Sequence, residues 1–229
     1  MKAWLWVAAT SQVAVFRIAS RRNREVLVSL LGEAWQGIVG SDRFSAYGHL
    51  QRRQLCWAHL CRDLKAMAER QGSSRAIGRT LLAVARWIFR DWHRFRDGTF
   101  GRYTLVDRLE PRSLRFIELL TQGALCEHAK TAGSCAEILA VADHAFTFAQ
   151  VEGVEPTNNL AERSLRPAVQ WRKQSAGTQS EHGSRYAERM LTCCTSLAFQ
   201  RRGIYDFLVN ALESQQLNTP APSLLPDGV

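Results

Sequence analysis

Two short apolar segments open the chain and predict a β-hairpin. Ala3–Ala9 is rich in strand-forming residues, Thr10-Ser11 is a short turn, and Gln12–Ile18 alternates apolar and polar positions. Alternation with a period of two is typical of strands with one buried face. The following apolar positions recur at helical spacing or form short buried runs. They predict five further elements in this order: helix Asn23–Trp35, strand Gly37–Gly40, helix Phe44–Leu50, strand Arg53–Trp57 and helix Ala58–Arg70.

From residue 71 to about residue 150 the pattern becomes helical. Helices are predicted over Ile77–Arg96, Arg112–Gln122, Ser134–Asp143 and Phe146–Gln150. The longest of them carries four aromatic residues, which we expect to pack in a core rather than to stack on bases: Trp87, Phe89, Trp92 and Phe95. Two more helices, Ser184–Gln200 and Ile204–Ser214, precede a tail that is expected to be frayed.

Between these helical regions, another helix is predicted after the turn residues Pro156 and Thr157. Thr157 or Asn158 can cap it by accepting a hydrogen bond from a free amide. Pro167 is expected to end or kink the helix near Arg166, because proline lacks the amide hydrogen that the next turn needs.

The two sides of this helix differ in chemistry. At 100° per residue, Ala161, Leu165 and Ala168 share one side. The other side gathers an amide, an acidic residue and two arginines: Asn159, Glu162, Arg163 and Arg166. Two interpretations are open. The stripe is either a solvated face with internal Glu–Arg pairing or a carboxylate that holds a metal beside arginines that hold phosphates.

Composition indicates a globular protein with an anionic partner. The chain has 229 residues, is 46% hydrophobic, and carries a net charge of +9. Nucleic acid is the first candidate partner. The charge is concentrated in residues 157–202, where eight Arg and Lys face three acids. No apolar run approaches ~20 residues, so a membrane span is not expected, and no signal peptide is recognised.

Asp42 is a second acidic residue of interest, because it follows the predicted strand Gly37–Gly40 almost directly. Ligands of open α/β sheets collect at the carboxyl ends of strands. The alternative is that Asp42 caps the helix predicted over Phe44–Leu50. The six cysteines show no disulfide framework and fit a reducing cytosol. Cys56, His59 and Cys61 offer a zinc cluster only at an unfamiliar spacing.

Five segments together resemble the catalytic half of the insertion-sequence-66 type of bacterial transposase. In chain order they are Ser41–Tyr47, Gln54–Leu64, Thr157–Pro167, Trp171–Lys173, and the group Gly177–Ser180, Gly183–Arg185 and Glu188-Arg189. Each motif alone is moderately specific, whereas their joint occurrence in this order is a strong signal. The resemblance extends over about Ala3 to Asn210.

This resemblance implies an α/β, ribonuclease-H-like (integrase-type) fold with an Asp-Asp-Glu triad. By motif, Asp42 corresponds to the second Asp and Glu162 to the Glu, as catalytic residues and metal ligands. Asn159, Trp57 and His59 are expected to line the site, although packing suits Trp57 better. The implied divisions are a first part of the core (1–70), a helical insertion (71–150), the catalytic Glu helix with carboxyl-terminal helices (151–214) and a flexible tail (215–229).

The resemblance also implies Mg²⁺ or Mn²⁺ as cofactor and the ends of a transposable element as the DNA partner. Carboxylates suit such hard cations, which act in phosphoryl transfer. Six basic residues are expected to neutralise DNA phosphates: Arg163, Arg166, Arg172, Lys173, Arg185 and Arg189. A homodimer is a further option, and a cytoplasmic, nucleoid-associated location in a bacterium follows from the same resemblance.

One departure concerns the first Asp of the triad, which the family carries on a strand just upstream of the segment resembling Lys2–Ala9. No Asp or Glu precedes Glu25. The chain is therefore expected to be an amino-terminally truncated transposase that lacks the first strand and is inactive alone. Two alternatives stay open: a non-catalytic DNA-binding or regulatory remnant of a mobile element, and a zinc-binding module around Cys56 and His59.

Overall fold

A computed structural model describes residues 3–226, which divide into two compact units. Within the described chain, unit 1 contains the residues up to Trp35, the short segment Ser45–His49, and the residues from Asn159 onward. Unit 2 contains Gln36–Phe44 and Leu50–Asn158. The predicted helical insertion, 71–150, therefore lies entirely within unit 2. Each unit is a mixture of helices with one two-stranded sheet.

The predicted hairpin is the centre of unit 1. Strand β1 (Trp4–Ala9) pairs antiparallel with β2 (Ala14–Ala19). The Thr10 amide donates to the Val13 carbonyl at 2.8 Å, which closes the turn. The other elements of this unit are α1 (Arg24–Leu31), the 3₁₀ turn η1 (Ser45–Tyr47), α7 (Asn159–Ser175), α8 (Glu181–Phe199) and α9 (Ile204–Gln216).

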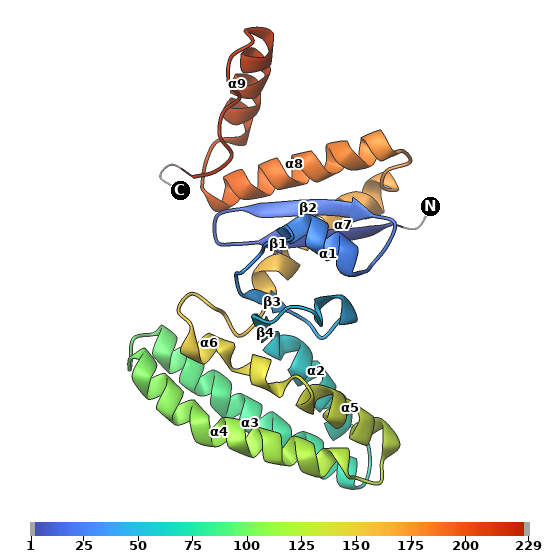
Figure 1. The fold of residues 1–229 in the computed structure, drawn as a ribbon, viewed down its shortest axis with the longest axis vertical. Helices are drawn as coiled ribbons and strands as arrows, with labels where there is room; N and C mark the ends of the chain where they lie inside the picture. The colour runs from blue at the N-terminus through green and yellow to red at the C-terminus, as the bar shows by residue number, and fades with distance from the viewer. Residues whose placement is uncertain (1–2, 227–229) are drawn as a thin grey trace. The chain divides into compact units, whose positions relative to one another are not determined.

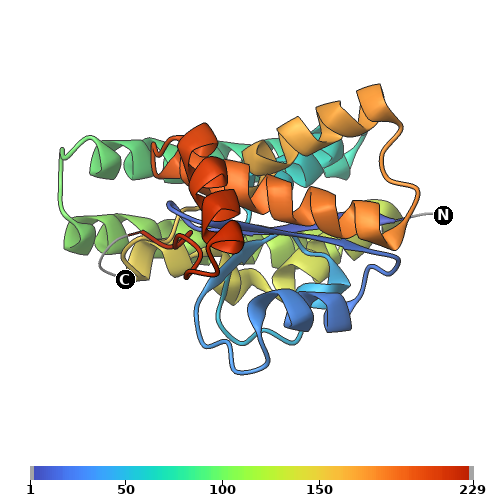
Figure 2. The same ribbon diagram turned by 90° about the horizontal axis from the view of Figure 1, so that it is seen from above.

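Helix α8 covers the outer edge of β2, and both views show it running along the hairpin (Figures 1 and 2). The amides of Ala14, Phe16 and Ile18 point outward from the strand. They donate to side-chain oxygens of Ser196 at 3.0 Å, Thr192 at 3.0 Å and Glu188 at 2.5 Å, respectively.

The spacings along the two elements explain this match. Two residues of a strand advance ~6.6 Å, and four residues of a helix advance ~6 Å. A polar row at every fourth helical position can therefore follow every second amide. These side chains replace a neighbouring strand and block the edge against pairing with other chains.

Helix α7 continues through Pro167 to Ser175, so the expected end near Arg166 is wrong. A proline inside a helix removes one backbone hydrogen bond. Burial of residues before and after Pro167 offsets this loss, since Ser164 and Ala168 are both buried. The Ser164 hydroxyl also donates to the carbonyl of Leu160 at 2.8 Å.

Unit 2 combines a short parallel sheet with a helical bundle. Strand β3 (Val39–Ser41) pairs parallel with β4 (Arg53–Leu55). The helices that follow are α2 (Trp57–Ala68), α3 (Ser73–Arg96), α4 (Arg102–Ala124), α5 (Ala129–Leu139), the 3₁₀ turn η2 (Ala142–Ala145) and α6 (Thr147–Gln150). The long helices α3 and α4 lie side by side in the green part of Figure 1.

The core of unit 2 is large and aromatic. Trp57, Phe116 and Phe148 are fully buried, and Trp57 contacts Phe116 with ring centroids 5.1 Å apart. The indole N–H of Trp57 donates to the Ala145 carbonyl at 2.6 Å. The buried amide of Gln54 donates to that same carbonyl at 2.9 Å and accepts from the Phe148 amide at 2.7 Å. These bonds connect β4 to the η2–α6 segment and satisfy the buried side-chain amide of Gln54.

Two glycines allow close approach of elements within unit 2. A side chain at Gly78 of α3 would come within 2.3 Å of the Ala68 amide nitrogen. At Gly123 of α4 it would come within 2.5 Å of the Cys135 sulfur in α5. Both positions therefore fix the spacing of neighbouring helices.

The predicted order of elements up to α2 is confirmed apart from the helix expected over Phe44–Leu50, and several predicted boundaries along the chain differ from the structure. Trp57 begins α2 instead of ending a strand, and only a 3₁₀ turn forms within Phe44–Leu50. Helix α4 begins at Arg102, although Pro111 lies inside it. Leu105 before the proline and Phe116 after it are both buried, so packing favours one continuous helix. Among residues 3–226, no helix has both the length and the apolarity to cross a bilayer.

Candidate functional site

Asp42 is the first residue after β3, as the sequence pattern indicated. It is half-buried, and its Oδ1 accepts a hydrogen bond from the Phe44 amide at 3.0 Å. Asp42 therefore holds the turn that leaves the sheet, which agrees with part of the capping alternative. One carboxylate oxygen is engaged in that turn, and the group stands at the carboxyl end of a parallel strand, where ligands commonly bind.

Cys56 joins the end of this sheet to the segment that leads into α7. Its amide donates to the carbonyl of Ser41, the residue before Asp42, at 2.8 Å. Its sulfur accepts from the Asn158 amide at 3.4 Å. The amide of Trp57 donates to the Pro156 carbonyl at 2.9 Å. The residues just before α7 are thus fixed beside the end of β3, although 102 positions separate Cys56 from Asn158.

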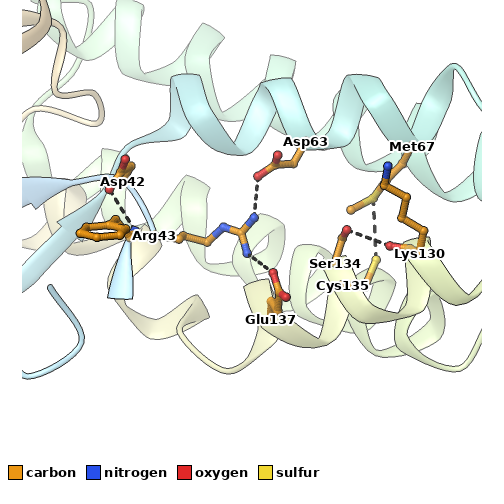
Figure 3. Close-up of polar contacts among 9 residues, drawn as sticks. Asp42, Arg43, Asp63, Met67, Lys130, Ser134, Cys135 and Glu137 are labelled. Atoms are coloured by element: carbon orange, nitrogen blue, oxygen red, sulfur yellow. Dashed lines mark hydrogen bonds and ion pairs between the residues drawn. The ribbon is translucent and has the colours of Figure 1, made fainter. Parts of the chain in front are cut away.

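Arg43 holds the loop after β3 against two helices of unit 2, as Figure 3 shows. Its guanidinium donates to Asp63 of α2 at 2.7 Å and to Glu137 of α5 at 3.2 Å. The Arg43 side chain is only 21% exposed. This two-sided contact restrains the backbone next to Asp42. No local sequence pattern indicated this contact, because both carboxylates are distant along the chain from Arg43.

Glu162 lies in the first turn of α7 and is half-buried. Asn159, the first residue of that helix, is exposed. Asp42 belongs to unit 2 and Glu162 belongs to unit 1. Their meeting in one site stays a prediction.

The other expected site residues have distinct surroundings. Trp57 is fully buried in the core of unit 2, so the packing role is the one observed. His59 lies in the first turn of α2, and its ring offers a nitrogen within 4.8 Å of the Cys56 sulfur. Burial raises the pKa of the Cys61 thiol to about 11, with a smaller contribution from Cys56.

The expected DNA-binding residues are exposed on α7 and α8. Arg163, Arg166, Arg172 and Lys173 lie on α7, and Arg185 and Arg189 lie on α8. Arg185 pairs with Glu181 one turn away at 2.7 Å, and both side chains are mostly exposed. Such a pair contributes little to stability. The role of these basic residues in DNA binding stays a prediction.

The polar loop between α7 and α8 is a helix cap. Ser180 accepts from the Gly183 amide at 3.0 Å, and the hydroxyls of Thr178 and Ser184 lie 2.7 Å apart. Ala176 and Gly177 both have positive φ, 57° and 78°, which turns the chain sharply after α7. A pocket of about 310 Å³ lies beside this loop, lined by residues of β1, α7 and α8 that include Trp4, Trp171 and Arg172.

Comparison with known proteins assigns the chain to a family. The model of the family described as "Transposase IS66 family" matches residues 1–186. The chain belongs to the IS66 family of transposases. The match includes β3 with Asp42, Cys56 with its partners Ser41 and Asn158, and α7 with Glu162.

One relative of the IS66 chain among curated proteins has no stated activity. It is the uncharacterized protein y4qI of Sinorhizobium fredii (strain NBRC 101917 / NGR234), 24% identical over 208 residues. The alignment covers 80% of this chain and 38% of the relative, so the chain spans well under half of that protein's length. No solved structure matches the chain.

The sequence analysis did not predict the structural role of Glu188 at the edge of β2. Glu188 belongs to one of the motifs that resemble the family, and its carboxylate accepts a hydrogen bond from the Ile18 amide. The spacing of Glu188, Thr192 and Ser196 is a readable signal for this role. Residues four apart lie on the same face of a helix, so these three polar side chains can contact the same neighbouring strand.

Proposed function

We propose that this IS66 chain acts in DNA transposition by metal-dependent phosphoryl transfer, with Asp42 and Glu162 as two metal-binding carboxylates. The observation that supports the proposal is the pair of hydrogen bonds that Cys56 forms with Ser41 and Asn158. Two hydrogen bonds connect the backbone next to Asp42 with Asn158. Asn158 directly precedes α7, the helix that carries Glu162 in its first turn.

The donor chemistry fits a hard divalent cation. Asp42 and Glu162 are both oxygen ligands, which Mg²⁺ and Mn²⁺ prefer over sulfur. The Phe44 amide orients the carboxylate of Asp42, and Arg43 restrains the backbone beside it. A bound cation would supply Lewis-acid polarisation of the phosphodiester and a more acidic water or hydroxyl nucleophile.

The described strands offer one acidic strand end and not two. Asp42 follows β3, whereas β1, β2 and β4 are followed by Thr10, Ser20 and Cys56. A ribonuclease-H-like triad needs a third carboxylate on a further strand. We therefore propose that the purified chain binds cation and DNA but does not perform strand transfer by itself.

DNA contact is assigned to the exposed basic residues of α7 and α8. Each phosphate neutralised by Arg or Lys releases counterions, which makes affinity fall steeply with salt. Arg172 and Lys173 are adjacent, exposed and near the pocket beside the α7–α8 loop. Binding through these groups does not require Asp42 or Glu162.

The test measures Mn²⁺ binding and DNA chemistry on the same proteins. Asp42→Asn and Glu162→Gln should each weaken Mn²⁺ binding at least tenfold in the presence of an element-end duplex. Glu110→Gln, at an exposed position on α4, is the matched control and should bind as the parent does.

Two outcomes would contradict the proposal. Unchanged Mn²⁺ affinity in both site variants, with DNA binding intact, would favour the non-catalytic DNA-binding alternative. Robust strand transfer by the purified chain, with Mg²⁺ or Mn²⁺, would refute the claim that it is inactive alone.

A further inference from the structure

Helix α3 carries an uncompensated row of arginines on its exposed side. Arg75, Arg79, Arg86 and Arg90 are all exposed. Their spacings of 4, 7 and 4 residues keep them within about 60° of one another around the helix. We call these four residues the α3 arginine stripe. From Arg75 to Arg90 the stripe extends about 22 Å along the helix axis, at 1.5 Å per residue.

No acidic side chain of the helix offsets this charge. Asp91 is the single acidic residue within α3, and it is fully buried. Its carboxylate contacts Arg112 and lies 3.9 Å from Arg108, both on α4. Among residues 3–226, no carboxylate lies within 4.0 Å of the four guanidinium groups of the stripe.

The stripe ends at a structured hollow. Ala83, Arg86, Trp87 and Arg90 line a surface depression of about 330 Å³. Trp87 is 47% exposed, which makes it the exception to the expectation that the aromatics of this helix lie in the core. The guanidinium carbon of Arg90 lies 3.7 Å from the indole centroid of Trp87. Stacking of this kind holds the planar group in place and leaves its edge N–H donors available.

We propose that the α3 arginine stripe is a second phosphate-binding surface, through which unit 2 contacts the backbone of duplex DNA. The stripe consists entirely of arginine, whose fork of donors fits phosphate oxygens in pairs. Arg86 and Arg90 line the same depression, whose volume of about 330 Å³ is large enough to admit a phosphate group. The inference rests on the proposed function for the identity of the polyanion, but it uses none of the residues assigned to α7 and α8.

The test compares salt dependence of binding to a short duplex of random sequence. Removing two phosphate contacts should reduce the log–log salt slope by about 1.8, since each contact contributes roughly 0.9. We expect Arg79→Gln with Arg86→Gln to show this reduction and to bind roughly tenfold more weakly at low salt. Among residues 3–226, neither side chain forms a hydrogen bond or ion pair with another helix or strand, since Arg86 donates only to the Leu82 carbonyl within α3. Circular dichroism checks that the helix content is kept.

The control removes the same charge elsewhere on unit 2. Lys65 and Arg115 are exposed, and each forms an ion pair with an acidic residue about one turn further along the chain, Glu69 and Glu118, respectively. Lys65→Gln with Arg115→Gln should leave the slope unchanged. An equal fall in both double variants, or no fall in the stripe variant, would overturn the inference.

A third variant separates this inference from the proposed function. Arg172→Gln with Lys173→Gln removes charge from α7 and should also lower the slope. If that variant binds like the parent while the stripe variant is weakened, the α7 assignment fails and the stripe stands. If the stripe variant alone binds like the parent, the stripe fails and the assignment on α7 stands.

Discussion

The two units of the chain are held together in different ways. Unit 2 has a continuous core in which Trp57, Phe116 and Phe148 are fully buried. Unit 1 buries fewer large side chains, chiefly Trp6, Phe16, Leu27 and Leu197, and no residue of α9 is buried. Its hairpin is instead secured by side chains of α8 that accept the outer amides of β2.

Apolar burial therefore contributes more to the stability of unit 2, whereas side-chain hydrogen bonds contribute more to that of unit 1. Burying a large apolar side chain contributes roughly 1.5–3 kcal/mol, whereas a net hydrogen bond contributes roughly 0.5–1.5 kcal/mol. Unit 2 should therefore be the more stable unit. Asp42 is fixed on this unit, and Glu162 stands on a helix of the less deeply packed one.

The largest expected effect is a cavity in the core of unit 2. Phe116→Ala should destabilise unit 2 by about 3–5 kcal/mol, because the lost ring leaves an unfilled space among fully buried neighbours. Leu114→Ala, two residues away on α4 and 63% exposed, should cost much less. Urea denaturation followed by tryptophan fluorescence measures both. Similar losses for the two variants would mean that the core does not dominate unit 2.

The next effect tests the polar edge of unit 1. Thr192→Val keeps the side-chain shape but removes the acceptor of the Phe16 amide, which should cost about 1–3 kcal/mol. Amide hydrogen exchange at Phe16 should accelerate. Thr121→Val is the control, since that hydroxyl only donates to Ile117 within α4. Unchanged protection of Phe16 would show that α8 does not secure the strand.

A smaller effect is expected at the loop after β3. Arg43→Gln removes the contacts to Asp63 and Glu137, of which the Glu137 side chain is 73% exposed. Exposed ion pairs are weak, so unit 2 should lose only about 1 kcal/mol. Mn²⁺ binding should weaken as well, because the backbone beside Asp42 is released. Lys65→Gln controls for charge, and loss of stability with normal Mn²⁺ binding would remove the positioning role of Arg43.

The smallest effect is a pH dependence within unit 2. Burial, together with the nearby Arg53, lowers the pKa of His144 below its ordinary value of 6.5. The unfolded chain therefore binds the proton more readily than the folded chain does. Stability from neutral His144 is present above pH 6.5 and should decline as the pH falls below it. His144→Gln should reduce the change in urea midpoint between neutral and mildly acidic pH, and an unaltered change would contradict the assignment.

Local patterns predicted much of this fold from the sequence. Alternation along Gln12–Ile18 predicted the hairpin partner, and a short apolar run predicted a strand directly before Asp42. Both signals are local, because the pattern of apolar residues within a strand indicates which of its faces is buried. Helical spacing in the same way predicted the exposure of Asn159, Arg163 and Arg166 on α7, whereas Glu162 on the same side is half-buried.

Long-range packing decided the features that local patterns missed. Pro111 and Pro167 lie inside helices because the burial of residues on both sides of each proline stabilises a continuous helix. The bond from Asn158 to Cys56 and the contact from Arg43 to Glu137 join residues 102 and 94 positions apart. Spacing along the chain carries no signal for such pairs, so the surroundings of Asp42 emerged only with the tertiary structure.

The most direct test of the central claim is a double-mutant cycle for Mn²⁺ binding. It compares the parent chain, Asp42→Asn, Glu162→Gln and the double variant in the presence of an element-end duplex. If both carboxylates hold one cation, each single change removes most of the binding and the double variant is little worse than either. Losses that simply add, or no loss in either single variant, would show that Asp42 and Glu162 do not share a metal site.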